Sequence, residues 1–252
     1  MKTDKKPNKK LGQHFLIDKK VISSIANEIK GDIALEIGGG TGNLSAEVIK
    51  NVNVLYIIEK DKKLADYLKS KIPNAIIINE DFLKIKPFNV DVIFGNLPYY
   101  ISSKILFRLY DWNFSYAILM FQKEFVEKML AKPGNKNFGR LSFNAQNCYE
   151  IEKLFCIKNT AFRPVPKVMS CVVKIKKIEK RVKCDDKIII RLFSQKNKKI
   201  KNIFKNVKFD SDNVSNFLSS IAEKRPWQLS FEEIKVLTEY LENLEKNGKA
   251  IN

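Results

Sequence analysis

A regular alternation of apolar runs and amphipathic stretches between residues 33 and 131 constrains the fold of this chain more than any other feature. Each apolar run is short and nearly continuous, which is typical of a strand buried on both faces of a sheet. Each run precedes a stretch with the apolar spacing of a helix. This alternation predicts a doubly wound α/β sheet. The expected strands are Ile33–Ile37, a run ending at Glu59, a run ending near Asp81, Val90–Phe94 and residues 116–122.

The pattern changes after residue 149. Two strand-like segments, residues 150–157 and 170–178, flank a loop and predict a hairpin at one edge of the sheet. From about residue 181 the pattern is helical, and Ser230 followed by Glu233 is the capping-box signature of a final helix. We therefore expect a Rossmann-like α/β domain over residues 1–180 and a small all-helical domain over residues 181–252.

The charge of the chain indicates its partner. Lysine and arginine number 46 against 28 acidic residues, a net charge of +18. Such an excess attracts polyanions, and nucleic acid fits better than an anionic membrane because no basic helix has a clean apolar face. The lysines also cluster, with seven in residues 1–20 and six in residues 195–208, which contain no acid. We predict that Lys198, Lys199 and Lys201 contact nucleic-acid phosphates.

Other features exclude whole classes of protein. The sequence has no apolar run of about 18 residues, and its first ten residues lack the apolar core of a signal peptide. His14 is the only histidine, and the four cysteines are too widely spaced for paired metal ligands. We expect a soluble, cytoplasmic monomer with no metal site. Its cysteines are expected to be reduced packing residues: Cys148, Cys156, Cys171 and Cys184.

A glycine-rich turn follows the first strand. A dinucleotide site of the G-x-G-x-x-G type that starts at Gly38 would need glycine at position 43, which is Asn43. The turn instead has the G-x-G-x-G spelling, with Glu36 two residues before its first glycine. This spelling fits class I methyltransferases, which bind S-adenosylmethionine.

Two acids at the ends of later strands agree with that cofactor. Glu59 lies about twenty residues after the turn, where an acid can accept hydrogen bonds from both ribose hydroxyls. Asp81 follows the third strand, where it can receive the adenine amino group. Each signal alone is weak, and Asp81 alone is more often a helix cap. Together they predict an S-adenosylmethionine site that includes Gly38, Gly40, Glu59 and Asp81.

The fourth strand ends in Asn96-Leu97-Pro98-Tyr99. An ordinary strand-to-helix turn explains the asparagine and the proline but not the aromatic ring. An exocyclic amino group is a poor nucleophile, since its lone pair is delocalised into the base. The Asn96 amide oxygen and a backbone carbonyl beside Pro98 can accept both amino hydrogens and aim that lone pair at a methyl group. Tyr99 offers a face for a base taken out of its helix.

These four residues resemble the amino-methyltransferase motif in the form found in the ribosomal RNA adenine dimethyltransferase family. The segments Lys9–Asp18, Phe138–Gln146 and Phe162–Ser170 are also similar to blocks of that family. The resemblance implies dimethylation of two adjacent adenosines near the 3′ end of small-subunit ribosomal RNA, in the immature small subunit. Trp227-Gln228 departs from the family pattern, so the resemblance is looser near the C-terminus.

The resemblance also implies roles for single residues. It assigns cofactor contacts to His14 and Leu16, and to Asn96 in addition to its catalytic role. It places Phe162 on the other face of the target adenine, against the alternative that Phe162 is a core residue. A surface histidine that caps the next helix is the alternative for His14.

Two other functions are compatible with the same sequence. One is a dimethyltransferase of the antibiotic-resistance type that acts on large-subunit RNA, although the Leu11–Leu16 spelling argues against it. The other is an RNA-binding assembly factor without turnover, which the intact Asn96–Tyr99 set disfavours.

Overall fold

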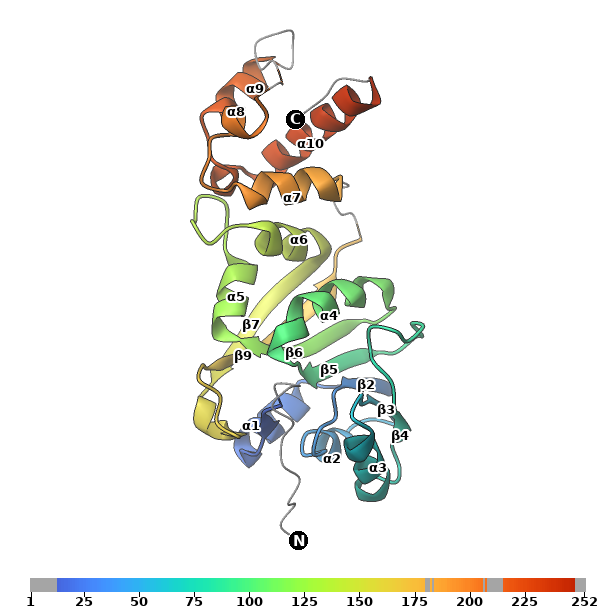
Figure 1. Cartoon of the computed structure of the whole chain (residues 1–252). Coiled ribbons are helices and arrows are strands. Elements are labelled where there is room, and N and C mark those ends of the chain that lie inside the picture. Colours follow the sequence, from blue (N-terminus) through green and yellow to red (C-terminus); the bar gives the residue numbers. More distant parts are fainter. Residues whose placement is uncertain (1–12, 180–181, 183, 206, 208–214, 248–252) are drawn as a thin grey trace. The chain divides into compact units, whose positions relative to one another are not determined.

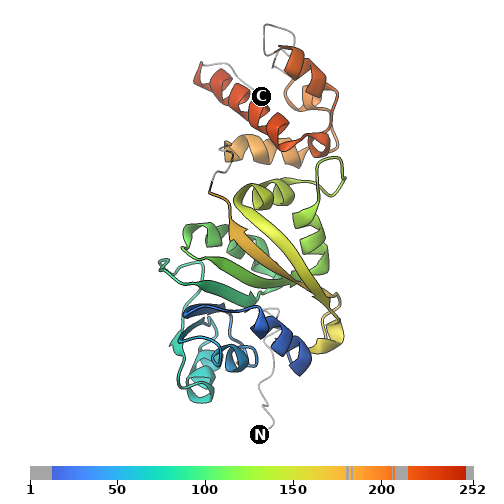
Figure 2. The same cartoon turned by 180° about the vertical axis from the view of Figure 1, so that it is seen from behind.

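The computed structural model describes residues 13–179, 182, 184–205, 207 and 215–247. The chain forms two compact units, residues 1–126 with 149–177 and residues 127–148 with 178–252. Figures 1 and 2 show the ribbon of each unit from opposite sides. The expected division at residue 180 placed residues 127–148 in the first domain, whereas the structure places them in the second unit. These residues join the second unit because Phe138 and Phe143 share a buried cluster with Phe193 and Leu237.

The first unit contains a seven-stranded sheet with the order β4-β3-β2-β5-β6-β9-β7. The strands from β4 to β6 are parallel, and β9 is antiparallel to both of its neighbours. The predicted α/β sheet and its edge hairpin are confirmed. The order of the strands switches between β2 and β5, because the chain builds the sheet outward in one direction from β2 to β4 and in the other direction from β5 to β6. In such sheets the ligand crevice lies at the carboxyl ends of the strands at this switch point. The strands are β2 (Ile33–Ile37), β3 (Val54–Ile58), β4 (Ile76–Ile78), β5 (Val92–Asn96), β6 (Tyr116–Gln122), β7 (Tyr149–Ile157) and β9 (Ser170–Lys177).

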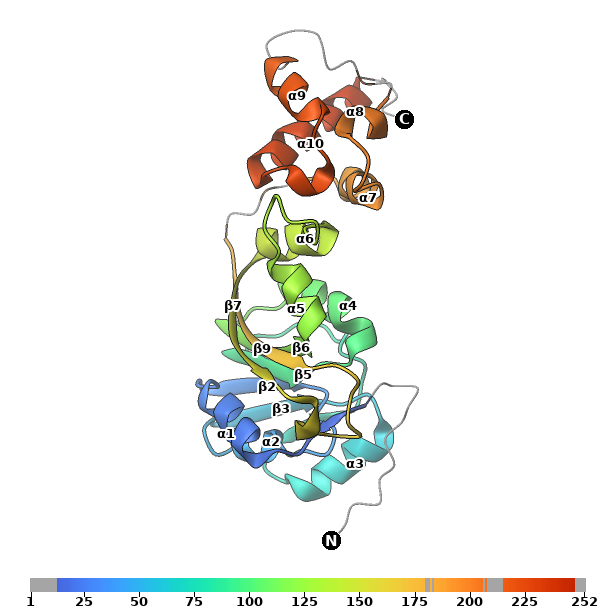
Figure 3. The same ribbon diagram turned by 90° about the vertical axis from the view of Figure 1, so that its left-hand side faces the viewer.

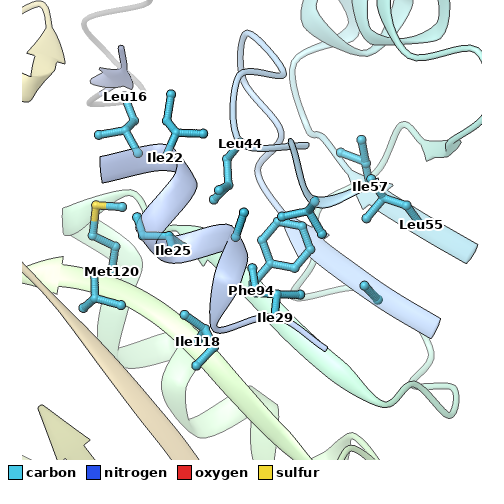
Figure 4. Close-up of a cluster of buried hydrophobic side chains, with 14 of the residues drawn as sticks. Leu16, Ile22, Ile25, Ile29, Leu44, Leu55, Ile57, Phe94, Ile118 and Met120 are labelled. Carbon is cyan, nitrogen blue, oxygen red and sulfur yellow. The ribbon is translucent and has the colours of Figure 1, made fainter. Parts of the chain in front are cut away.

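Helices cover both faces of this sheet. Figure 3 shows α1, α2 and α3 on one face and α4 on the other. On the first face, Ile22 and Ile25 of α1 are buried in one cluster with Phe94 of β5 and Ile118 of β6 (Figure 4). This packing fixes the strand ends that carry the glycine turn and Asn96. The helices are α1 (Lys19–Asn27), α2 (Ser45–Val48), α3 (Lys62–Lys71) and α4 (Ser102–Arg108).

The second unit is helical throughout its described part. The Ser230 side chain accepts a hydrogen bond from the Glu233 amide, which confirms the predicted capping box. The helix at residues 140–148, α6, was not among the expected elements. The helices are α6 (Arg140–Cys148), α7 (Asp186–Ser194), α8 (Ile200–Ile203), α9 (Ser215–Ala222) and α10 (Phe231–Lys246), and α5 (Lys123–Leu130) runs from the first unit into the second.

The expectation of four reduced cysteines was wrong for one pair. Cys156 on β7 and Cys171 on β9 are register partners and form a disulfide, whereas Cys148 and Cys184 are not disulfide-bonded. Two cysteines that face each other across neighbouring strands cannot be recognised from their spacing alone. Within the described residues, no group of three metal-ligating side chains occurs, and no helix is long and apolar enough to cross a membrane.

Candidate active site

One cavity lies at the carboxyl ends of β2, β3 and β5 in the first unit. It is lined by the glycine turn, by the acids after β3 and β4, by the Asn96–Tyr99 segment and by residues 13–16. The structure therefore brings together residues that lie up to 92 positions apart in the sequence, from Gln13 to Ile105. The predicted residues that line it are His14, Leu16, Gly38, Gly40, Glu59, Asp81, Asn96, Leu97, Pro98 and Tyr99.

The glycine turn is shaped by backbone that only glycine adopts easily. Gly38 has a φ of 77° and Gly40 a φ of 53°, both in the left-handed region. A Cβ added at Gly38 would meet no atom within 4 Å, so the turn opens directly onto free space. The Gly38 amide donates to the Ile58 carbonyl at 2.8 Å and ties the turn to β3. A ligand can thus approach the backbone closely at this turn.

Glu59 connects the glycine turn with the end of β3. One carboxylate oxygen accepts the Gly40 N–H and the other accepts the Asp61 N–H, each at 2.9 Å. The side chain is buried, and this burial raises the pKa of Glu59. The hydrogen bonds from the two amides act to lower the pKa, but the effect of burial is larger. The carboxylate is therefore held in a fixed orientation at the wall of the cavity.

Asp81 lies at the more exposed side of the cavity. Its carboxylate accepts hydrogen bonds from the Lys60 ammonium at 2.9 Å and from the Leu83 amide at 3.0 Å. Burial acts to raise the pKa of Asp81, but these bonds outweigh it and the pKa is lowered. Asp81 is thus a charged acceptor in a fixed position.

Glu36 lines the cavity, although it was expected only as part of the glycine motif and not as a site residue. Only 2% of its surface is exposed, and the Ser45 hydroxyl donates to its carboxyl group. Burial raises the pKa of Glu36 to about 8, with the Ser45 bond acting in the opposite direction. Its position two residues before Gly38 was the sequence signal that could have identified it.

The segment before α1 closes one side of the cavity. β1 (Phe15–Leu16) pairs with β8 (Phe162–Arg163) in a separate two-stranded sheet. The Asn43 side chain donates to the Leu16 carbonyl at 2.8 Å, which anchors this segment to the glycine turn. The His14 ring bonds the Pro164 carbonyl through Nδ1 at 2.7 Å rather than capping the next helix, whose cap is Asp18.

Asn96 is held by the same segment. Its Nδ2 donates to the His14 carbonyl at 2.7 Å, which leaves the amide oxygen as the atom for an incoming donor. The Pro98 carbonyl accepts the Ile101 amide and the Ser102 hydroxyl, so it serves the turn itself. Of the two carbonyls beside the proline, the Leu97 carbonyl is therefore the candidate acceptor.

Tyr99 is fixed at both ends of its side chain. Its hydroxyl shares a hydrogen bond of 2.9 Å with Ser170, and its ring stacks near the His14 ring with a centroid distance of 5.8 Å. Burial raises the pKa of Tyr99. The ring is thus preorganised as a wall of the cavity.

Phe162 does not join this site. Its side chain is fully buried in the core cluster that includes Leu16, Ile157 and Ala161, and it does not line the cavity. Phe162 therefore has the packing position of the alternative expectation, and its place on the second face of a target adenine stays a prediction. The alternating burial of the short strand β8 turns Phe162 inward and Arg163 outward.

The lysines predicted to contact nucleic acid belong to the second unit and do not line this cavity. Lys199 and Lys201 both form ion pairs with Glu223, the first at 2.6 Å. Hydrogen bonds from these two lysines lower the pKa of the Glu223 carboxyl to about 2. Lys198 is exposed. A polyanion that binds here would compete with Glu223 for two of the three lysines.

Comparison with known proteins gives consistent results. The family model described as ribosomal RNA adenine dimethylase matches residues 4–239. The ribosomal RNA small subunit methyltransferase A of Thermotoga petrophila is 37% identical over 244 residues, which cover 91% of this chain and 89% of that protein. The protein of the same name from Parabacteroides distasonis is 36% identical over 250 residues and covers 92% of this chain and 93% of its own length.

Solved structures extend the likeness to the fold. A dimethyladenosine transferase from Plasmodium falciparum superimposes with a TM-score of 0.76 at 28% identity, over 94% of this chain and 100% of that one. The 23S rRNA methyltransferase ErmE has a TM-score of 0.66 at 24% identity, over 89% of this chain and 99% of its own. At that identity ErmE shares the fold, and the likeness carries nothing about the RNA that is modified.

Proposed function

The chain belongs to the ribosomal RNA adenine dimethylase family, and from this premise we propose that it methylates two adjacent adenosines near the 3′ end of small-subunit ribosomal RNA. It is an enzyme, an rRNA adenine dimethyltransferase. The methyl donor in this proposal is S-adenosylmethionine, and the substrate is the immature small subunit. The observation that carries the proposal is the meeting of Asn96–Tyr99, the Gly38 turn and Glu59 at one cavity.

The residues around the cavity fit this cofactor. The open space beside Gly38 admits a ligand against the backbone, and Glu59 supplies a fixed carboxylate of the kind that ribose hydroxyls bind. Asp81 is the acceptor for the adenine amino group, while His14 and Leu16 cover the bound cofactor. S-adenosylmethionine, when bound, supplies the electrophilic methyl group.

The Asn96–Tyr99 segment prepares the adenosine amino group. The Asn96 amide oxygen and the Leu97 carbonyl accept its two hydrogens, which draws the nitrogen out of conjugation with the ring. Pro98 fixes the direction of the Leu97 carbonyl, because its own φ is held at −60°. Tyr99 stacks on the extruded base.

These groups work by position and partial charge, without a side-chain base. After methyl transfer the nitrogen carries a positive charge, which the two oxygens stabilise until a proton leaves to water. The hydrogen bond from Asn96 Nδ2 to the His14 carbonyl sets the amide orientation that this chemistry needs. Residues 13–16 therefore support both the cofactor and the acceptor.

A methyl-transfer assay tests the proposal. Small subunits that lack dimethyladenosine are incubated with labelled S-adenosylmethionine, large subunits serve as the matched control, and mass mapping locates the product. We expect two adjacent dimethyladenosines in small-subunit RNA. Transfer to large-subunit RNA would favour the antibiotic-resistance type of enzyme, and RNA binding without transfer would favour an assembly factor.

A further inference from the structure

Most of the exposed large apolar side chains belong to segments that line the cavity or are hydrogen-bonded to residues that line it. Among the residues that the structure describes, seven large apolar side chains are exposed. Two of them, Ile76 and Ile190, lie elsewhere. The remaining five are called the apolar rim. Tyr100 lines the cavity, Ile17 follows the cavity residue Leu16, and Val165, Val168 and Met169 lie in a loop next to residues that are bonded to His14 and Tyr99.

Hydrogen bonds tie the rim to the cavity wall. Tyr100 itself lines the cavity. Val165 follows Pro164, whose carbonyl is bound by the His14 ring, and Met169 precedes Ser170, whose hydroxyl is bound by Tyr99. The loop of residues 158–169 is thus bonded near its middle to His14, and it ends beside Ser170, the hydrogen-bond partner of Tyr99.

The same loop is held in place along its length. The Asn159 side chain donates to the Pro166 carbonyl at 3.2 Å, and the Lys123 amide donates to the Met169 carbonyl at 2.9 Å. Pro164 and Pro166 further restrict the backbone. The loop therefore presents its apolar side chains in a fixed arrangement, and little conformational entropy is lost when a ligand binds them.

The charge around the rim identifies the kind of ligand. Lys158, Arg163 and Lys167 are exposed cations of the loop, and residues 158–170 contain no acid. A surface in which apolar side chains alternate with cations matches a nucleotide, which has an apolar base face and a charged phosphate. Only a ligand with both properties uses all of this surface.

We infer that the apolar rim receives the unpaired bases next to the target adenosine, an inference that rests on the function proposed above. A base that leaves its stack deprives its neighbours of a stacking partner. Apolar side chains can replace that partner and hold the strand open. The rim would thereby favour a single-stranded substrate with the target extruded.

Serine substitution at Val168 and Met169 tests this inference. Both side chains are exposed and neither lines the cavity, so the fold and cofactor binding should be retained. The probe is a synthetic hairpin RNA with two adjacent adenosines in its loop and 2-aminopurine at the preceding nucleotide. Ile76→Ser, at an equally exposed position on β4, is the matched control.

We expect the double variant Val168→Ser/Met169→Ser to bind this RNA at least about ten-fold more weakly, the lower bound for one apolar side chain that is no longer buried against a base. The dependence of affinity on salt should not change, because no cation is removed. The 2-aminopurine signal on binding should fall, while calorimetry with S-adenosylmethionine and the melting temperature should match the control.

Wild-type RNA affinity and 2-aminopurine signal in the double variant would overturn the inference. The proposed function fails separately: in that case the wild-type chain itself transfers no methyl group to small subunits.

Discussion

Replacing Glu59 by glutamine is a stringent test of the cofactor site. The two carboxylate oxygens of Glu59 accept the amides of Gly40 and Asp61, each at 2.9 Å. Glutamine has one oxygen, so one of these backbone donors would face an NH₂ group. The change keeps the size of the side chain and removes its charge and half of its acceptor capacity.

The expected magnitudes follow from these contacts. A buried amide without an acceptor costs about 1–3 kcal/mol of folding free energy. Loss of one charge-assisted hydrogen bond to a ribose hydroxyl costs about 1.5–3 kcal/mol of binding free energy. The dissociation constant for S-adenosylmethionine should therefore rise by about 10- to 150-fold.

Isothermal calorimetry measures this effect, and thermal unfolding measures the cost to the fold. Glu47→Gln makes the same substitution at the surface, where Glu47 pairs with Lys50, and should leave binding unchanged. Undiminished S-adenosylmethionine binding by Glu59→Gln would refute the assignment of Glu59. Binding of NAD by the wild-type chain in place of S-adenosylmethionine would refute the whole cofactor site.

Three further predictions concern other groups. Tyr99→Phe keeps the ring and should lose little methyl transfer, whereas Tyr99→Ala should lose much more; equal rates in the two variants would exclude stacking. Burial raises the pKa of Glu36 to about 8. Between the ordinary pKa of a carboxyl group and this raised value, Glu36 is protonated in the folded chain and ionised in the unfolded chain. The free energy of unfolding should then fall with rising pH, by at most about 1.4 kcal/mol per unit, and urea titrations of Glu36→Gln should show a flatter slope; an unchanged slope would contradict this. Lys198→Ala with Lys199→Ala should lower the slope of log affinity against log salt by about 0.7–0.9 per lost RNA phosphate contact, and an unchanged slope would leave these lysines, one of them paired with Glu223, as solvated surface.

The sequence could predict features that repeat or that lie close together in the chain. The apolar run at Tyr116–Gln122 predicted both ends of that strand correctly. The capping-box signature correctly identified Ser230 as the N-cap of α10. The glycine turn and Glu59 could be assigned to one cavity because parallel strands bring their carboxyl ends to the same edge.

Features that depend on distant contacts could not be predicted in this way. The burial of Phe162 results from the pairing of β8 with β1, two strands of two residues each that lie far apart in sequence. The disulfide requires Cys156 and Cys171 to be register partners, which spacing does not reveal. The pairing of Lys199 with Glu223 likewise joins two segments whose proximity only the fold determines.

The central claim is that Asn96 prepares the adenosine amino group for attack, and single-turnover methyl transfer by Asn96→Ala tests it most directly. The substitution removes the amide acceptor and the bond from Nδ2 to the His14 carbonyl, while β1 stays paired with β8 and anchored by Asn43. With saturating S-adenosylmethionine and immature small subunits, the rate should fall by about 30- to 1000-fold, equivalent to roughly 2–4 kcal/mol in the barrier. A rate near that of the wild-type chain would contradict the mechanism.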